Sequence, residues 1–282
     1  MKFIVPEELD GITVKTFLRR HENVSARLLA KLKRTENGMT VNGKVVRSVD
    51  TLKAGDEIKL SLPADEMHIG QGEGKAEVVY EDENVIVFDK PPDMTVHPVG
   101  NKQDGTLANI AAAYAMSRGE NYTFRAVNRL DKDTSGLVLT AKNPYAAAFL
   151  QNRAEKVYIA LCHGKIGGEG TIDAPLRIKE GHTIQRETGE GGKKAVTHYK
   201  VIKNYGDEYT LLEIHLETGR THQIRTHFSS IGHPLAGDDM YGGSREHFPR
   251  QCLHCAELSF PDPITKEMIH LSRSIDFFDE YR

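Results

Sequence analysis

The segment NRLDKDTSGLVLTAKN, residues 128–143, crowds charged side chains of both signs in front of an apolar run. In order, it holds Arg129, Asp131, Lys132 and Asp133, then a Thr-Ser-Gly turn, then the apolar residues 137–139. An aspartate in such a turn commonly accepts hydrogen bonds from backbone N–H groups. Here the flanking cations also favour an ionised carboxylate, which can act as a base or a nucleophile. Asp131 is therefore a candidate catalytic residue.

A second group of possible functional residues surrounds the start of a predicted helix in ETGRTHQIRTHFSSIGHPLAGDDMYGG. Its cationic and imidazole side chains are Arg220, His222, Arg225, His227 and His233. The two histidines at 222 and 227 lack the four-residue spacing that brings two metal ligands together on a helix, so we expect no metal. Arg220 lies in a Thr-Gly-Arg turn, where it can pair with a phosphate or with the carboxylate of Asp131. A structural salt bridge is the alternative.

Two further motifs allow both a structural and a functional interpretation. Cys252 and Cys255 form one C-x-x-C pair without a second pair, and strand-like alternation follows them, which favours packing over a metal or redox role. Tyr158 lies in the predicted strand KVYIALCHG. A strand tyrosine is commonly half-buried, but beside basic residues it can stack on a nucleic-acid base.

The elements that must position these residues alternate irregularly along the chain. The sequence predicts strands at 85–88, 125–127, 137–139 and in the segments KVYIALCHG, KAVTHYKVI and EYTLLEIHLETG. It predicts helices at 106–118, from the Asn143-Pro144 cap to Arg153, and in THQIRTHFSSIG, which Gly232 can end. This order favours an α+β fold on a central mixed or antiparallel sheet flanked by helices over a doubly wound parallel sheet.

The N-terminal part differs from the rest in charge and in pattern. Two short helices with Ser25 as a cap and Asn37-Gly38 as a stop precede an Asn42-Gly43 hairpin and a strand after Gly55-Asp56. Residues 1–62 carry twelve Lys and Arg against eight Asp and Glu, so their net charge is +4. Because the whole chain has a net charge of −3, the remaining residues have −7. We expect a small α/β module at 1–62, a linker at 63–75 and the main domain at 76–282.

The whole chain has 282 residues, and 39% of them are hydrophobic, enough for a sizeable core. Three cysteines are too few for a disulfide framework, and the first residues lack a signal-peptide pattern, so we expect the cytoplasm. The longest apolar stretch is too short to cross a bilayer, which argues against a membrane role.

Five segments together resemble the RluA-type RNA pseudouridine synthases and occur in that family's order. They are VIVFDKPPDMTVHP, NRLDKDTSGLVLTAKN, KVYIALCHG, LETGRTHQIRTH and RQCLHCAELSF. The resemblance covers residues 76–282, and residues 1–62 resemble the S-four type RNA-binding domain, the αL motif. It implies the pseudouridine synthase fold, RNA as partner, and isomerisation of uridine in ribosomal or transfer RNA without cofactor or metal.

The resemblance also implies roles for individual residues. Asp131 matches the catalytic aspartate, Tyr158 the tyrosine that stacks on the target uracil, and Arg220 the basic residue that pairs with the carboxylate. Arg129 matches the arginine that fills the space left by the flipped base. Lys90 and His97 fall in a motif of mainly structural role, and we place them with His222 and Arg225 among the expected substrate-binding residues. For RNA binding by the module we expect Arg19, Arg20, Arg27, Lys31, Lys33 and Arg34.

The chain departs from the family pattern at two positions, and two other functions stay open. Asn128 stands where the family mostly has His, and Asp93 where it often has Gly, a residue free to adopt positive φ. An RNA-binding factor with a vestigial centre is one alternative, although the three expected catalytic residues are present. A glycoside hydrolase is the other, but it needs two cooperating acids, and only Asp133 is near. A monomer is the default oligomeric state.

Overall fold

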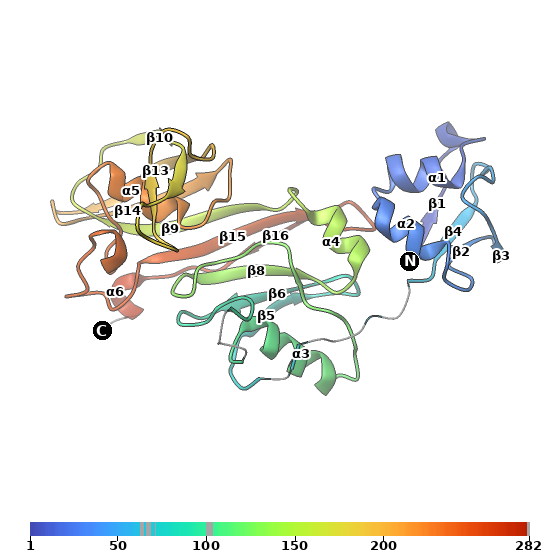
Figure 1. Ribbon diagram of the computed structural model, residues 1–282, viewed down its shortest axis with the longest axis horizontal. Helices are drawn as coiled ribbons and strands as arrows, with labels where there is room; N and C mark the ends of the chain where they lie inside the picture. The colour runs from blue at the N-terminus through green and yellow to red at the C-terminus, as the bar shows by residue number, and fades with distance from the viewer. Residues whose placement is uncertain (63–64, 66–68, 71, 100–103, 281–282) are drawn as a thin grey trace.

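The computed structural model describes residues 1–62, 65, 69–70, 72–99 and 104–280 (Figure 1). In these residues the strands form a four-stranded sheet, a ten-stranded sheet and a two-stranded sheet. No helix in the described part of the chain combines the length and the apolar character that crossing a bilayer requires.

The N-terminal sheet has the order β1-β4-β2-β3, and helices pack on it. The strands and helices of this part are, in chain order, β1 (Lys2–Ile4), η1 (Glu7–Leu9), α1 (Val14–Thr16), η2 (Phe17–His21), α2 (Ala26–Leu32), β2 (Met39–Val41), β3 (Lys44–Val45) and β4 (Glu57–Leu60). Ser25 caps α2, since its Oγ accepts from the Leu28 N–H at 3.1 Å. Asn42 and Gly43 both have positive φ, 48° and 80°, as a two-residue hairpin turn requires. The expected helices, cap and hairpin are confirmed.

The second helix ends earlier than the sequence suggests. It was expected to stop at Asn37-Gly38, but α2 ends at Leu32, where N–H groups bond carbonyls three residues back and the Thr35 hydroxyl bonds the Lys31 carbonyl. Gly38 is needed for a different reason, because a Cβ there would lie 2.1 Å from the Leu32 carbonyl oxygen. The glycine permits the chain to pass the helix end closely.

The large sheet has the order β10-β13-β14-β9-β15-β8-β6-β5, with β16 beside β15 and β7 beside β8. Its strands are β5 (Glu77–Glu81), β6 (Val85–Lys90), β7 (Arg125–Ala126), β8 (Ser135–Ala141), β9 (Glu155–His163), β10 (Glu169–Asp173), β13 (Val196–Tyr205), β14 (Tyr209–Leu216), β15 (Leu253–Pro261) and β16 (Met268–Ser272). The β8–β15 pair is parallel and the other pairs are antiparallel. The expected mixed sheet is confirmed.

Helices pack on this sheet (Figure 1), and a two-stranded hairpin forms a separate sheet. They are α3 (Leu107–Ser117), α4 (Pro144–Leu150), α5 (Gln223–Ser230), η3 (Asp239–Tyr241) and α6 (Phe277–Glu280), and the hairpin pairs β11 (Leu176–Ile178) with β12 (Arg186–Thr188). The expected caps form at Thr106 and Asn143. The helix that begins at Pro144, α4, was expected to reach Arg153 but ends at Leu150.

Two buried strands and one glycine fix the middle of the sheet. Every residue of β8 is buried, and residues 85–88 of β6 are fully buried beside it. Gly136 has a φ of 110°, and a Cβ there would lie 2.3 Å from the carbonyl oxygen of Cys255. Because only glycine fits, the Thr-Ser-Gly turn feeds β8 directly against β15. The Asp131 loop is thus anchored to the core.

His254 on β15 predicts how stability depends on pH. It is buried between the Ser135 hydroxyl, 2.8 Å from Nδ1, and the Arg273 carbonyl, 3.2 Å from Nε2, and burial lowers its pKa to about 4. The unfolded chain binds a proton below about pH 6.5 and the folded chain does not, so folding becomes less favourable as the pH falls. From pH 7 to pH 5 this group should cost roughly 2 kcal/mol of unfolding free energy.

Urea unfolding of wild type and His254→Gln at the two pH values tests this. The variant should lose less stability on acidification than wild type. His247→Gln, at an exposed histidine, is the control and should behave as wild type. Equal pH dependence of all three proteins would contradict the assignment.

Candidate active site

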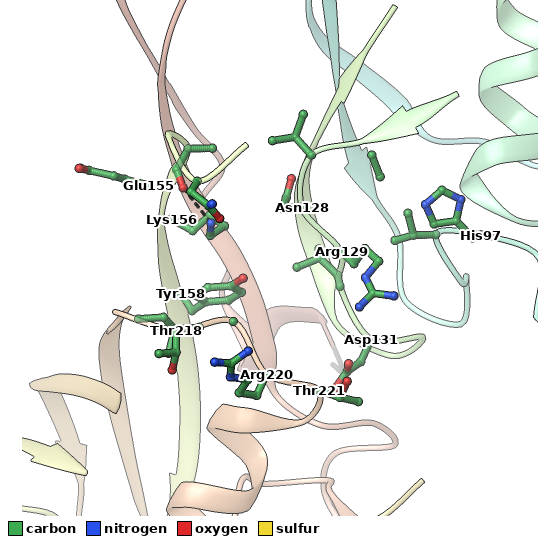
Figure 2. A pocket seen from close by; sticks show the side chains of 18 of the residues that line it. His97, Asn128, Arg129, Asp131, Glu155, Lys156, Tyr158, Thr218, Arg220 and Thr221 are labelled. Carbon is green, nitrogen blue, oxygen red and sulfur yellow. Dashed lines mark hydrogen bonds between the residues drawn. The ribbon is translucent and has the colours of Figure 1, made fainter. Parts of the chain in front are cut away.

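A cavity of about 870 Å³ opens between two parts of the large sheet (Figure 2). One wall is residues 126–131, from the last residue of β7 onward, and the other is the start of β9 together with the end of β14 and the turn after it. Asp131 and Arg129 lie on the first wall, and Tyr158 and Arg220 lie on the second. His97 completes the lining on the side of the first wall. Chain segments far apart in sequence therefore converge here.

Asn128 holds the loop that carries Asp131. Its side-chain amide donates to the Leu137 carbonyl at 3.1 Å, and its Oδ1 accepts from the Leu139 N–H at 2.8 Å, both on β8. The Asp131 carbonyl accepts from the Thr134 N–H at 3.2 Å. At this departure from the family pattern, the asparagine ties the loop to the core strand through two buried hydrogen bonds.

Arg225 is the cation that pairs with Asp131. Its Nη1 lies 3.1 Å from Asp131 Oδ2, while Nε and Nη2 bind the two carboxylate oxygens of Asp238 at 2.7 and 2.8 Å. The side chain of Asp238 is 1% exposed and that of Asp131 is 26% exposed. Burial alone would lower the pKa of Arg225, but the hydrogen bonds and charge of Asp238, with the charge of Asp131, raise it. The guanidinium therefore stays charged between two carboxylates.

The expectation that Arg220 pairs with Asp131 is wrong. Arg220 lines the cavity, but its Nε donates to the Lys194 carbonyl at 3.0 Å, and among the described residues it forms no ion pair with Asp131. The reason is position: Arg220 belongs to the turn before α5, whereas Arg225 lies in the helix and is buried facing the loop. Arg220 remains available to a ligand in the cavity.

His222 extends the same cluster. It adopts a left-handed conformation with φ of 57° just before α5. Its Nε2 lies 3.8 Å from Asp131 Oδ2, and its Nδ1 lies 2.9 Å from the Tyr241 hydroxyl. Burial lowers the pKa of His222, so the ring is neutral at neutral pH. Neither His222 nor Arg225 is a lining residue of the cavity, and both touch the carboxylate from behind.

The cavity wall formed by β9 presents an aromatic and a cationic side chain. Tyr158 is 7% exposed, and burial raises the pKa of its phenol well above the ordinary value, so it is neutral. Lys156, two residues earlier on the same strand face, also lines the cavity, and burial lowers its pKa. Opposite them, Arg129 is exposed and forms no hydrogen bond or ion pair with another described residue. The ring of Tyr158 and the guanidinium of Arg129 thus lie on opposite walls of the cavity.

Lys90 has a structural role, and the expectation that it binds substrate is wrong. Its side chain is 0% exposed, and its ammonium donates to the carbonyls of Pro91, Met94 and Lys132 at 2.8, 2.8 and 3.0 Å. Burial lowers the pKa of Lys90 to about 7. The lysine ties the loop after β6 to the Asp131 loop. In that loop Asp93 has a φ of 58°, as expected where the family has glycine, and pairs with Lys132 at 2.6 Å.

The remaining candidates from the sequence pack inside the domain. His227 contacts the Thr197 hydroxyl at 2.8 Å and the Ala174 carbonyl at 2.9 Å. Cys252, just before β15, and Cys255, on β15, are fully buried, and burial raises the pKa of Cys255 to about 12, which agrees with the packing interpretation. Sequence reasoning missed Asp238, although it lies in the segment containing Arg225. The only signal was the Gly-Asp-Asp turn, which does not tell which aspartate faces inward.

Comparison with known proteins identifies the family and agrees with this fold. Residues 84–230 match the family model described as RNA pseudouridylate synthase, and residues 1–58 match the RluD ribosomal pseudouridine synthase N-terminal domain. The family model covers more than half of the chain, so the chain belongs to the RNA pseudouridylate synthase family. It is an RNA pseudouridine synthase of the RluA type, an isomerase.

Individual relatives span most of the chain. The uncharacterized RNA pseudouridine synthase YhcT of Bacillus subtilis is 39% identical over 81% of this chain and 78% of its own length. The ribosomal large subunit pseudouridine synthase D of Pseudomonas aeruginosa is 37% identical over 92% of this chain and 85% of its own length. Among solved structures, human RNA pseudouridylate synthase domain containing 1 has a TM-score of 0.60 and 28% identity over 74% of this chain and 86% of its own.

The ion-pair geometry predicts that Asp238 supports catalysis without touching substrate. Asp238→Asn keeps the shape but removes the charge that holds Arg225, so the guanidinium no longer fixes Asp131. We expect kcat to fall by about tenfold to a hundredfold with KM little changed, because small misplacements of reacting groups are costly. Release of tritium from C5-labelled uridine in RNA measures the rate.

Asp239→Asn is the matched control. This neighbouring aspartate is exposed and pairs with Arg245 at 2.9 Å on the surface, so its loss should leave the rate unchanged. Circular dichroism must first show that both variants are folded. Equal rates for the two variants would refute the role of Asp238.

Proposed function

We propose that this synthase isomerises uridine in large-subunit ribosomal RNA, with Asp131 as the catalytic carboxylate. The choice of RNA rests on relatives such as the Pseudomonas aeruginosa enzyme, whose name gives that substrate. The single observation that carries the catalytic role is the carboxylate of Asp131, fixed from behind by Arg225 and partly exposed toward the cavity. Transfer RNA is the alternative substrate.

The reaction requires the target nucleotide to leave the RNA stack. Its bond from ribose C1′ to base N1 breaks and a bond from C1′ to C5 forms, while the proton on C5 is lost to solvent and N1 takes up a proton, so the product is an isomer of uridine. An enzyme that works on a stacked base must extrude it at a cost of a few kcal/mol. The cavity volume lies within the range of roughly 300–1,000 Å³ typical of ligand pockets, so a nucleotide can be accommodated.

The side chains around the cavity have distinct proposed roles. Tyr158 stacks on the extruded uracil, since its neutral ring forms part of the wall. Arg129, exposed and without an ion pair to other described residues, enters the gap left in the RNA. Arg220 and His97, which line the same space, bind the nucleotide. His222 and Arg225 orient the carboxylate rather than bind the base.

The proposal includes action in the cytoplasm as a monomer, without metal or cofactor. The isomerisation breaks and remakes bonds within one nucleotide and transfers no electrons to or from another compound. Its chemistry therefore calls for no oxidant, reductant or group donor. The charged side chains at the cavity suffice for proton transfer and for nucleophilic or electrostatic stabilisation.

A comparison of RNA substrates tests the proposed function. We expect the purified enzyme to release tritium from unmodified large-subunit ribosomal RNA labelled at uridine C5, and to leave a pool of transfer RNA labelled in the same way unchanged. Sequencing of pseudouridine positions then identifies the site. Release from transfer RNA alone would reverse the assignment of substrate, and release from neither RNA would remove it.

The six expected RNA-binding cations of the module are all exposed. Arg19 donates to the Val24 carbonyl, whereas Arg20, Arg27 and Lys31 are exposed on or beside the helices η2 and α2. Replacing these three with glutamine should reduce the slope of log affinity against log salt by about two to three, since each phosphate contact releases counterions.

The control makes the same change of charge on the sheet of the module. Lys44 on β3, Lys59 on β4 and Lys53 in the segment before β4 are exposed, and their replacement by glutamine should change the slope much less. Filter binding of the ribosomal RNA over a range of salt concentrations measures both variants. Identical slopes for the two triple variants would show that the helix cations make no special contact.

A further inference from the structure

The N-terminal module shares its hydrophobic core with the catalytic domain. Tyr145 of α4 is fully buried, and the core cluster to which it belongs otherwise consists of buried module residues such as Phe17, Leu29 and Ile58. Its ring meets that of Phe3 edge-on, with centroids 5.6 Å apart. Burying a tyrosine contributes on the order of 2 kcal/mol, so the contact favours a docked module.

Lys266 pins this contact from the turn between β15 and β16. It adopts positive φ, 65°, and its ammonium lies 4.3 Å from the ring centroid of Phe149 and 5.7 Å from that of Tyr145. The same ammonium pairs with Glu22 of the module at 3.2 Å and lies 5.8 Å from the ring of Phe3. One cation therefore bridges aromatic rings of both parts and a carboxylate of the module.

A second contact joins the module to the rim of the cavity. Arg153 donates from Nη2 to Oδ1 of Asn23, at 3.2 Å, just after the basic helix η2. The neighbours of Arg153 on both sides, Asn152 and residues 154–156, line the cavity. The end of the module that carries Arg19 and Arg20 is thus connected through Asn23 and Arg153 to residues next to the cavity lining, and the module lies beside α4 (Figure 1).

We propose that the docked module and the cavity form one continuous RNA-binding surface of fixed spacing, held by the contact of Lys266 with Glu22 and the aromatic rings. Its partner is an RNA that presents the target uridine together with a flanking segment whose phosphates reach the basic helices. The inference rests on the proposed function, because it assigns the cavity to the uridine. A fixed module gives the second contact a high effective concentration, whereas a loosely tethered module lowers it.

The first test compares wild type with a variant that lacks the charges of Lys266 and Glu22, the pin variant, and measures both proteins on two RNAs. Lys266→Met with Glu22→Gln removes both charges and keeps the bulk of the side chains. For an RNA long enough to reach the module, KM should rise about tenfold with kcat unchanged. For a short oligonucleotide that fills only the cavity, both constants should equal those of wild type.

Lys2→Met with Glu57→Gln is the matched control. This ion pair, 3.0 Å long, is exposed on the same module. Among the described residues, its two side chains form no ion pair with a catalytic-domain residue. It should leave both RNAs unaffected. An unchanged KM for the long RNA in the pin variant would overturn the proposal. If wild type converts neither RNA, the proposed function fails instead.

A distance measurement tests docking without depending on activity. Lys44 on β3 and Lys200 on β13 are exposed, and replacing both with cysteine provides two sites for spin labels. The native cysteines at 162, 252 and 255 are all 0% exposed, so they should not be labelled. Electron–electron double resonance should give one narrow distance distribution in the otherwise wild-type chain and a broad one in the pin variant. A broad distribution in the wild-type background would overturn the proposal.

Discussion

The structure depends on one buried guanidinium placed between two carboxylates. Arg225 is held by both oxygens of Asp238 and offers its remaining Nη1 to Asp131. A buried charge is costly unless its partners are well placed, and here the bidentate pair with Asp238 supplies that geometry. The partly exposed carboxylate at the cavity therefore has a charged hydrogen-bond partner on its buried side.

The rest of the catalytic domain keeps this cluster in register. Gly136 permits the parallel contact of β8 with β15, Asn128 ties the loop before it to β8, and Lys90 joins that loop to the one after β6. Each of these residues fixes the backbone around the site. The exposed guanidinium groups of Arg129 and Arg220 line the cavity, where a ligand can contact them. A fixed carboxylate beside accessible cations is suited to holding a nucleotide in one geometry.

Local patterns in the sequence predicted the elements well because their causes are local. Ser25 and Asn143 cap the helices that follow them, Asn42-Gly43 makes the hairpin turn, and the apolar run at 85–88 becomes a buried strand. The partners of the site residues depend on the tertiary fold instead. Arg220 and Arg225 stand close in the same motif, and only the turn into α5 and the position of Asp238 determine that the second arginine faces Asp131. Lys90 likewise has the charge of a ligand-binding residue, and only the tertiary fold places its ammonium against three backbone carbonyls.

The central claim is that the carboxylate of Asp131 performs the chemistry while the surrounding surface binds RNA. Asp131→Asn tests it most directly, because the amide preserves the shape of the side chain and removes its negative charge. Affinity for labelled RNA and tritium release should be measured on the same protein preparation. The account predicts RNA binding close to that of wild type and no release above background. Release at the wild-type rate would contradict it.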